Sequence, residues 1–135
     1  MKLIINDNIT IKELQQQFSL GFLYLKLEFF DIPPTKNGLP KSHMYPAYKL
    51  LGACRKMHHE GIVQITPGDT VQKLEGIFWT EYGLSAEVFR KSGNLWIETT
   101  LSDSWTLKKQ NAEGQIFSSA KGDKYIEPDE PWADD

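Results

Sequence analysis

An internal repeat constrains the fold of this chain more than any other feature of its sequence. Residues 10–18 (TIKELQQQF) align with residues 70–78 (TVQKLEGIF), with threonine, a β-branched residue, leucine and phenylalanine at matching places. Each threonine is expected to cap a helix, because its hydroxyl can accept a hydrogen bond from a free amide of the first turn. Thr10 and Glu13 also match the capping-box pattern. The repeat therefore predicts two equivalent helices, each with one apolar side facing a common core.

Short strands are expected on both sides of each helix. Apolar residues two positions apart, the spacing typical of a strand, occur in residues 3–5 before the first helix and in residues 63–65 before the second. After the first helix, residues 23–30 alternate with a clear period of two, and residues 86–89 do so after the second. The chain thus reads as two strand–helix–strand units.

Glycines mark the expected ends and turns of these elements. Gly21 and Gly83 lie where each helix should end, because glycine adopts the left-handed conformation of a helix end without strain. The sequence Ser92-Gly93-Asn94 favours a tight hairpin turn, since glycine and asparagine tolerate a positive φ. The chain then continues into a further strand over residues 95–99.

Two short helices are expected in addition. The first covers roughly residues 47–58, where Tyr48, Leu51 and Cys54 recur at helical spacing. The second covers residues 105–111, after several candidate capping residues, and Gly114 is expected to stop it.

This order of elements predicts an α+β fold. Two strand–helix–strand units joined end to end favour a ferredoxin-like βαββαβ sheet with both helices on one face, an added C-terminal hairpin strand and a short third helix. A β-grasp sheet is the alternative. Residues 1–119 are expected to form a single α+β domain with a loop-rich basic insertion at residues 31–60, which opens with Pro33-Pro34.

The formal net charge is -3, but the charges are unevenly distributed along the chain. Residues 35–59 carry five lysines and arginines, three histidines and no acidic residue. From Lys121 onwards, six acidic residues face two lysines. Because this acidic segment contains two prolines and few apolar residues, we expect residues 120–135 to be a disordered acidic tail.

The chain shows the features of a cytoplasmic protein. No apolar run approaches the roughly 18 residues needed to cross a bilayer, so no membrane association is expected. The single cysteine, Cys54, cannot form an internal disulfide, which agrees with a reducing compartment. No phosphate-binding or dinucleotide-binding loop occurs, and we expect no cofactor.

Histidines and the cysteine are the first candidates for chemistry. His43, His58 and His59 are of the types that bind zinc, but neighbouring histidines point in different directions, and surface histidines explain them equally. Cys54 stands beside Arg55, and nearby cations favour the reactive thiolate. The alternative is that Cys54 is a small core residue on the same apolar stripe as Leu51.

Carboxylates on neighbouring strands are a second candidate. Glu28, Glu87 and Glu98 could converge across the sheet, as paired carboxylates do in acid–base sites. Solvated positions on the outer face of the strands would explain them as well.

The face of the predicted sheet that points away from the helices is the preferred binding site. Aromatic side chains on an open sheet can stack on a partner, and lysines lie among them. The binding residues predicted on this face are Tyr24, Phe30, Phe89, Trp96, Lys26 and Lys91. Three alternatives would hide the face: the insertion covers it, the third helix with Trp105 covers it, or two copies of the chain pair through it.

Part of the sequence resembles a known family. Residues 89–100 (FRKSGNLWIETT), followed by Trp105-Thr106-Leu107 and Gln110-Asn111, are similar to a pattern of a family of small bacterial proteins. The helix-opening residues 9–14 (ITIKEL) resemble that family as well. No activity, cofactor or partner is established for that family, so the resemblance implies no site residue.

These observations favour a non-enzymatic binding module with a macromolecular partner. A protein is preferred to a nucleic acid because the net charge is -3 and the aromatic motif of RNA-binding sheets is missing. Pairing of two copies is left open. The alternative function is a small enzyme that uses Cys54 with His58, or a histidine metal site.

Overall fold

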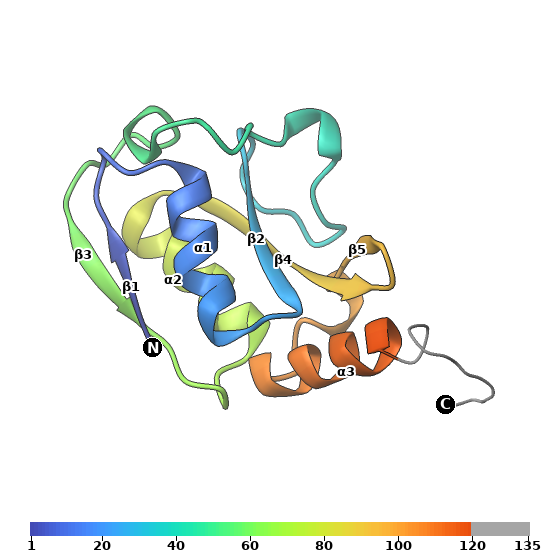
Figure 1. The fold of residues 1–135 in the computed structure, drawn as a ribbon. Coiled ribbons are helices and arrows are strands. Elements are labelled where there is room, and N and C mark those ends of the chain that lie inside the picture. The colour runs from blue at the N-terminus through green and yellow to red at the C-terminus, as the bar shows by residue number, and fades with distance from the viewer. Residues whose placement is uncertain (120–135) are drawn as a thin grey trace.

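The computed structural model describes residues 1–119, which form an α+β fold with two antiparallel sheets (Figure 1). The predicted acidic tail, residues 120–135, lies outside the described residues. The elements, in chain order, are β1 (Lys2–Ile5), α1 (Ile11–Gly21), β2 (Leu25–Phe30), β3 (Gly61–Gln64), α2 (Val71–Tyr82), β4 (Ser85–Ser92), β5 (Leu95–Glu98) and α3 (Leu107–Ser119). Short 3-10 turns are η1 (Lys41–His43), η2 (Leu51–Ala53) and η3 (Thr100–Ser102).

The two helices predicted from the repeat form as expected. The Thr10 hydroxyl accepts from the Glu13 amide at 3.1 Å, and the Glu13 carboxylate accepts from the Thr10 amide at 2.8 Å, which completes the capping box. The Thr70 hydroxyl accepts from the Lys73 amide at 3.1 Å. The apolar residues of both stripes are buried: Ile11, Leu14 and Phe18 on α1, and Val71, Leu74, Phe78 and Tyr82 on α2.

The strands pair by repeat equivalence. β1 pairs with β3 and β2 pairs with β4, both antiparallel, and β5 joins β4 as a hairpin. Leu3 faces Val63, and Leu27 faces Val88. Both registers are those of a two-fold axis that relates each residue to the one 60 positions later. The ferredoxin-like order within a single sheet is not confirmed, because the strands form two sheets and the insertion separates β2 from β3.

A segment beyond each repeat returns to the start of its helix. The first two amides of α1, Ile11 and Lys12, donate to the carbonyls of Lys49 (2.9 Å) and Ala47 (2.8 Å). These amides have no partner within the helix, so the returning chain satisfies them. The bonds use the backbone of the segment that was predicted to be helical, which explains why the helix expected at 47–58 shrinks to the turn η2.

The second helix is closed in the same way. Val71 and Gln72 donate to the carbonyls of Trp105 (3.1 Å) and Asp103 (2.8 Å). Isolated bridges repeat the pattern, with Thr10 paired to Leu50 and Thr70 paired to Thr106. The structural repeat therefore includes the returning segments, and residues 47–51 correspond to residues 103–107.

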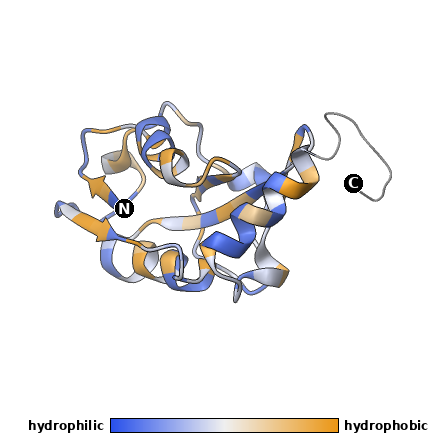
Figure 2. Ribbon diagram, turned by 60° about the horizontal axis from the view of Figure 1, so that its bottom comes forward, coloured by the Kyte–Doolittle hydropathy of each residue, from blue (hydrophilic) through white to orange (hydrophobic). Residues whose placement is uncertain are grey.

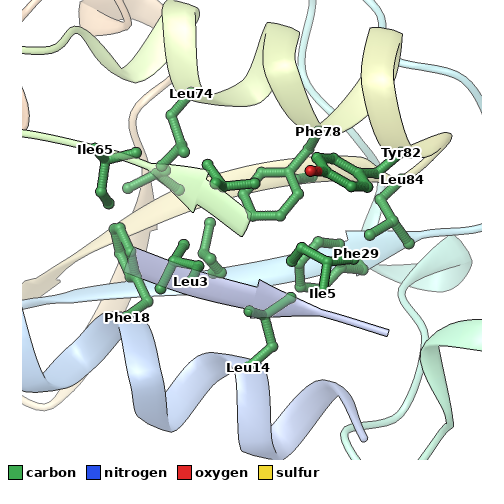
Figure 3. Close-up of a cluster of buried hydrophobic side chains, with 14 of the residues drawn as sticks. Leu3, Ile5, Leu14, Phe18, Phe29, Ile65, Leu74, Phe78, Tyr82 and Leu84 are labelled. Carbon is green, nitrogen blue, oxygen red and sulfur yellow. The ribbon is translucent and has the colours of Figure 1, made fainter. Parts of the chain in front are cut away.

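The core lies between the two sheets and the two main helices. Figure 3 shows Leu3 and Ile5 of β1, Leu14 and Phe18 of α1 and Phe78 of α2 pointing into one cluster. Phe29 of β2 meets Phe78 edge-on, with ring centroids 5.5 Å apart. Along the helices and strands, hydrophobic and hydrophilic residues alternate around this core (Figure 2).

The third helix differs from its prediction at both ends. α3 begins at Leu107 rather than residue 105, and Thr106 caps it by accepting from the Lys109 amide at 3.1 Å. Gly114 does not stop the helix but lies within it. A Cβ at Gly114 would be 2.8 Å from the Tyr24 Cβ, so glycine is required for α3 to approach β2 closely.

Two of the three predicted glycine roles are confirmed. Gly83 ends α2 in the left-handed conformation with φ 64°, and Gly93 has φ 62° in the turn of the β4–β5 hairpin. Gly21 was predicted to do the same for α1, but it is the last helical residue and Phe22 caps the helix with φ -139°. Gly21 instead lies against Met1, whose Cε would be 1.7 Å from an added Cβ.

None of the helices within residues 1–119 has both the length and the apolar character needed to cross a bilayer.

We predict that Leu14→Ala and Leu74→Ala each lower the free energy of unfolding by about 2 to 5 kcal/mol, because both side chains are fully buried at equivalent places. Urea denaturation measures the change. Leu20→Ala is the matched control, since Leu20 is on α1 but 82% exposed, and it should change little. Wild-type midpoints for both core variants would contradict the equivalence of the two helices.

We predict opposite effects for alanine at two helical glycines. Gly114→Ala should destabilise by roughly 1 to 3 kcal/mol, because its methyl group would clash with Tyr24. Gly76→Ala on α2 should stabilise by up to about 1 kcal/mol, because no atom lies within 4 Å of the added Cβ and alanine favours helix. Thermal melting of both variants checks the pair, and equal shifts would count against the close packing of α3.

Candidate functional site

The insertion covers the middle of the outer face of the β2–β4–β5 sheet. Phe30 and Phe89 are each only 2% exposed and form a cluster with Leu39 of the insertion. Ile32 and Met44, also from the insertion, pack on the same cluster. This is one of the three arrangements that the sequence left open. Phe30 and Phe89 are therefore not available as an open aromatic platform.

The other predicted binding residues are spread over the rest of that face. Trp96 is half-buried, and the Lys26 ammonium lies 5.2 Å from the centre of its ring. Lys91 faces Trp96 across the β4–β5 pair. Tyr24 lies at the far end of β2, where its amide donates to the Asn111 side chain of α3 at 2.9 Å. The structure thus brings Lys26, Lys91 and Trp96 together but separates them from Tyr24.

The three histidines lie apart. The Nδ1 of His58 lies 2.8 Å from Asp7, and the Nδ1 of His43 lies 2.7 Å from Asp31. The ring of His59 instead packs near Tyr82, with centroids 5.2 Å apart. Across residues 1–119, no group of three or more His, Cys, Asp or Glu side chains is arranged to hold a metal ion.

Cys54 has the surroundings of a core residue. Its side chain is buried, and its Sγ donates to the Leu50 carbonyl at 3.3 Å. Burial raises the pKa of this thiol to about 11, with Lys49 opposing the shift only weakly. The thiolate that nucleophilic chemistry needs is disfavoured there. His58, the proposed partner of Cys54, is held by Asp7 instead.

The predicted carboxylates occupy the outer face of the sheet, each with a different partner. Glu28 and Glu87 are directly opposite each other across the β2–β4 pair. Glu28 binds Lys26 at 2.8 Å, whereas Glu87 accepts from the Thr100 hydroxyl at 2.6 Å. The same hydroxyl lies 3.2 Å from Glu98.

A fourth carboxylate, which the sequence interpretation missed, lies close to this group. Glu75 of α2 accepts from the Val88 amide at 2.9 Å. Burial raises the pKa of Glu75 to about 8, and the charges of Glu87 and Asp103 add to the shift. Burial also raises the pKa of Glu87. These carboxyl groups line a cavity of about 60 Å³, which is too small for more than a few water-sized groups.

The largest pocket of the described residues has a volume of about 770 Å³. It lies where the basic insertion meets the end of α2 and the beginning of β4. Aromatic and aliphatic side chains form most of its wall, and basic residues of the insertion line one side. The lining residues are Phe30, Asp31, Ile32, Pro33, Tyr45, Ala53, Cys54, Arg55, Lys56, Met57, Trp79, Thr80, Gly83 and Ser85.

Two polar residues of the pocket wall have unused hydrogen-bonding capacity. The Arg55 side chain is fully buried and bridges to Asp7 at 2.8 Å and to the His59 carbonyl at 2.9 Å, but its Nη1 has no partner among the described residues. The Oγ of Ser85 is also buried without a partner there. Buried polar groups are normally paired, so such atoms point to a bound group.

Sequence interpretation drew attention to one side of this pocket only. The basic insertion supplies residues 53–57, but Trp79 and Thr80 lie just beyond the residues that the repeat aligns, and they point away from the core stripe. Their exposure was the available signal, since Trp79 is 41% exposed. Comparison of the chain with protein-family models, curated proteins and solved structures gives no match.

We predict that stability falls as the pH rises from about 4.5 to about 8, because Glu75 binds its proton more tightly in the folded chain. Glu75→Gln should remove much of this fall, roughly 2 to 4 kcal/mol at pH 8, since each pKa unit corresponds to about 1.4 kcal/mol. Glutamine can still accept from the Val88 amide. Urea titrations across this pH range measure the slope.

The matched control for this pH test is Glu81→Gln, an exposed glutamate on the same helix. It should keep the slope of the unmodified chain. A Glu75→Gln variant with an unchanged slope would show that burial of this carboxyl does not govern the pH dependence.

Proposed function

We propose that this protein is a non-enzymatic binding module that receives a protein partner in the 770 Å³ pocket between the basic insertion and the end of α2. The pocket itself is the observation that supports this function. Large apolar side chains, Trp79 and Met57, stay about 40% exposed at its edge. Residues of these types are enriched at protein interfaces, where a few buried aromatic anchors contribute most of the binding energy.

A protein suits this pocket better than a nucleic acid. Phe30 and Phe89, which could have stacked on bases, are covered by the insertion. The net charge of -3 gives little long-range attraction to phosphate. The cations near the pocket belong to a single short segment, residues 35–59, and favour an acidic group on the partner.

A second candidate surface is the exposed part of the outer sheet face. Trp96 lies there between Lys26 and Lys91, as an aromatic residue flanked by two cations. This surface retains three of the binding residues predicted from the sequence. It lacks a cavity among the described residues, and we rank it below the pocket for that reason.

Three expectations from the sequence stay predictions beside this proposal. They are the ferredoxin-like relationship, membership of the family of small bacterial proteins, and a cytoplasmic location. The free Cys54 supports the last of these, since cysteines stay reduced in the cytoplasm.

We predict that Trp79→Ala weakens partner binding by tenfold or more, because an aromatic anchor at a pocket contributes about 2 kcal/mol or more. The measurement is quantitative affinity capture from a cell extract with full-length protein, followed by direct titration of the partner so identified. Trp96→Ala is the matched control and should bind as the unmodified chain does. If only Trp96→Ala loses the partner, the outer sheet face is the site, and equal binding by both variants would exclude both surfaces.

A further inference from the structure

The pocket lies where the two repeats differ most. In the second repeat, the returning segment leads directly into α3, which runs for 13 residues. In the first repeat, the equivalent segment forms only the turn η2 (Leu51–Ala53) before the chain leaves for β3. Leu51 and Leu107 are equivalent, and both are fully buried at the start of these elements. The first repeat therefore begins the same helix but does not continue it.

α3 covers a defined surface of the second repeat. The Gln110 side chain accepts from the Arg90 guanidinium at 3.1 Å, and Gly114 lies against Arg90 and Tyr24. Phe117, near the end of α3, lies 5.9 Å from the same guanidinium. The helix thus packs on the end of β4 and on the chain that enters β2.

The two-fold relation transfers this surface to the first repeat. A shift of 60 residues relates Arg90 to Phe30, and Tyr24 to Leu84. Phe30 lines the pocket, and so do Gly83 and Ser85 on either side of Leu84. The pocket is therefore the first-repeat counterpart of the ground that α3 occupies in the second.

We infer that the pocket is a docking groove for an acidic amphipathic α-helix of a partner protein, seated on the first repeat as α3 is seated on the second. This inference rests on the proposed function and names the partner's structure. The helix would follow on from η2 and pack its apolar side against Phe30, Met57 and Trp79. The acidic character follows from charge complementarity with the insertion, where Lys56 and Arg55 line the pocket and no acidic residue occurs over residues 35–59.

The unpaired polar atoms of the pocket support the same occupant. In the second repeat, side-chain oxygens of α3 accept from groups of the surface beneath, namely Gln110 from Arg90 and Asn111 from the Tyr24 amide. In the first repeat, the Ser85 hydroxyl and the Arg55 Nη1 are donors without an acceptor among the described residues. A glutamate or aspartate side chain on a docked helix supplies acceptors of this kind.

The test is selection from a phage-displayed library of random 13-residue peptides, the length of α3, on the full-length protein. Each enriched peptide is then titrated against two variants. Thr80→Trp fills the pocket from an exposed position on α2, and Leu20→Trp places the same side chain at the repeat-equivalent position on α1, outside the pocket. Circular dichroism of both variants establishes that they fold.

We expect enriched peptides to be acidic and to carry apolar residues at positions i, i+3, i+4 and i+7, the spacing of an amphipathic helix. They should gain helical circular dichroism on binding, lose at least tenfold in affinity with Thr80→Trp, and keep their affinity with Leu20→Trp. Added salt should weaken them, because the rim contacts are charged.

Other outcomes overturn the inference in distinguishable ways. Peptides that depend on Thr80 but lack helical spacing, or stay non-helical when bound, would overturn the helix and leave the binding pocket standing. Displacement of a bound peptide by a synthetic peptide of residues 120–135 would assign the groove to the chain's own acidic segment. Enrichment of no peptide that depends on Thr80 would exclude helix docking, and loss of partner capture by Trp79→Ala would still preserve the proposed function.

Discussion

The first amides of an α-helix have no acceptor inside the helix, and this protein supplies acceptors to both of its main helices from a later part of the chain. Ala47 and Lys49 provide them for α1, and Asp103 and Trp105 provide them for α2. These bonds hold the second half of the insertion against α1 and the approach to α3 against α2. The positions of η2, α3 and the large pocket all follow from them.

Because the two repeats share this arrangement, their differences can be compared position by position. Gln15 and Glu75 are equivalent, and each bonds the backbone of the strand that follows its helix. Gln15 donates to the Leu27 carbonyl at 2.6 Å, whereas Glu75 accepts from the Val88 amide at 2.9 Å. The neutral amide can be buried at little cost, but the carboxylate cannot, which raises the pKa of Glu75.

The same comparison separates structure from candidate function. α3 closes the second repeat with its own side chains and buries the surface around Arg90. The first repeat leaves the equivalent surface open and lines it with cations from the insertion. A duplicated unit has thus kept one copy complete and left the other with a pocket.

Local elements could be predicted from the sequence because their signals are local. The threonine caps, the apolar stripes and the Gly93 turn act within a few residues, and all three are confirmed. The strand pairing could not be read in the same way, because a period-two pattern identifies a strand but not its neighbour. Gly114 misled for a related reason, since close approach to Tyr24 requires a glycine as strictly as a helix end does.

The candidate site was harder to predict because its residues come from separate parts of the chain. Alternation placed Phe30 and Phe89 on the outer face correctly, but only the folded insertion decides whether that face is open. Its Leu39 covers both rings. The pocket joins the insertion to the end of α2 through pairing with the start of α1, and no local pattern announces that contact.

Amide hydrogen exchange at the first turns of α1 and α2 tests most directly whether the returning segments close both repeats. Lys12 and Gln72 are second helical residues, whose amides exchange rapidly when they have no acceptor. Their bonds to the carbonyls of Ala47 and Asp103 predict protection comparable to that of the helix interior. Fast exchange at both amides, alongside a protected interior of the same helices, would contradict the arrangement.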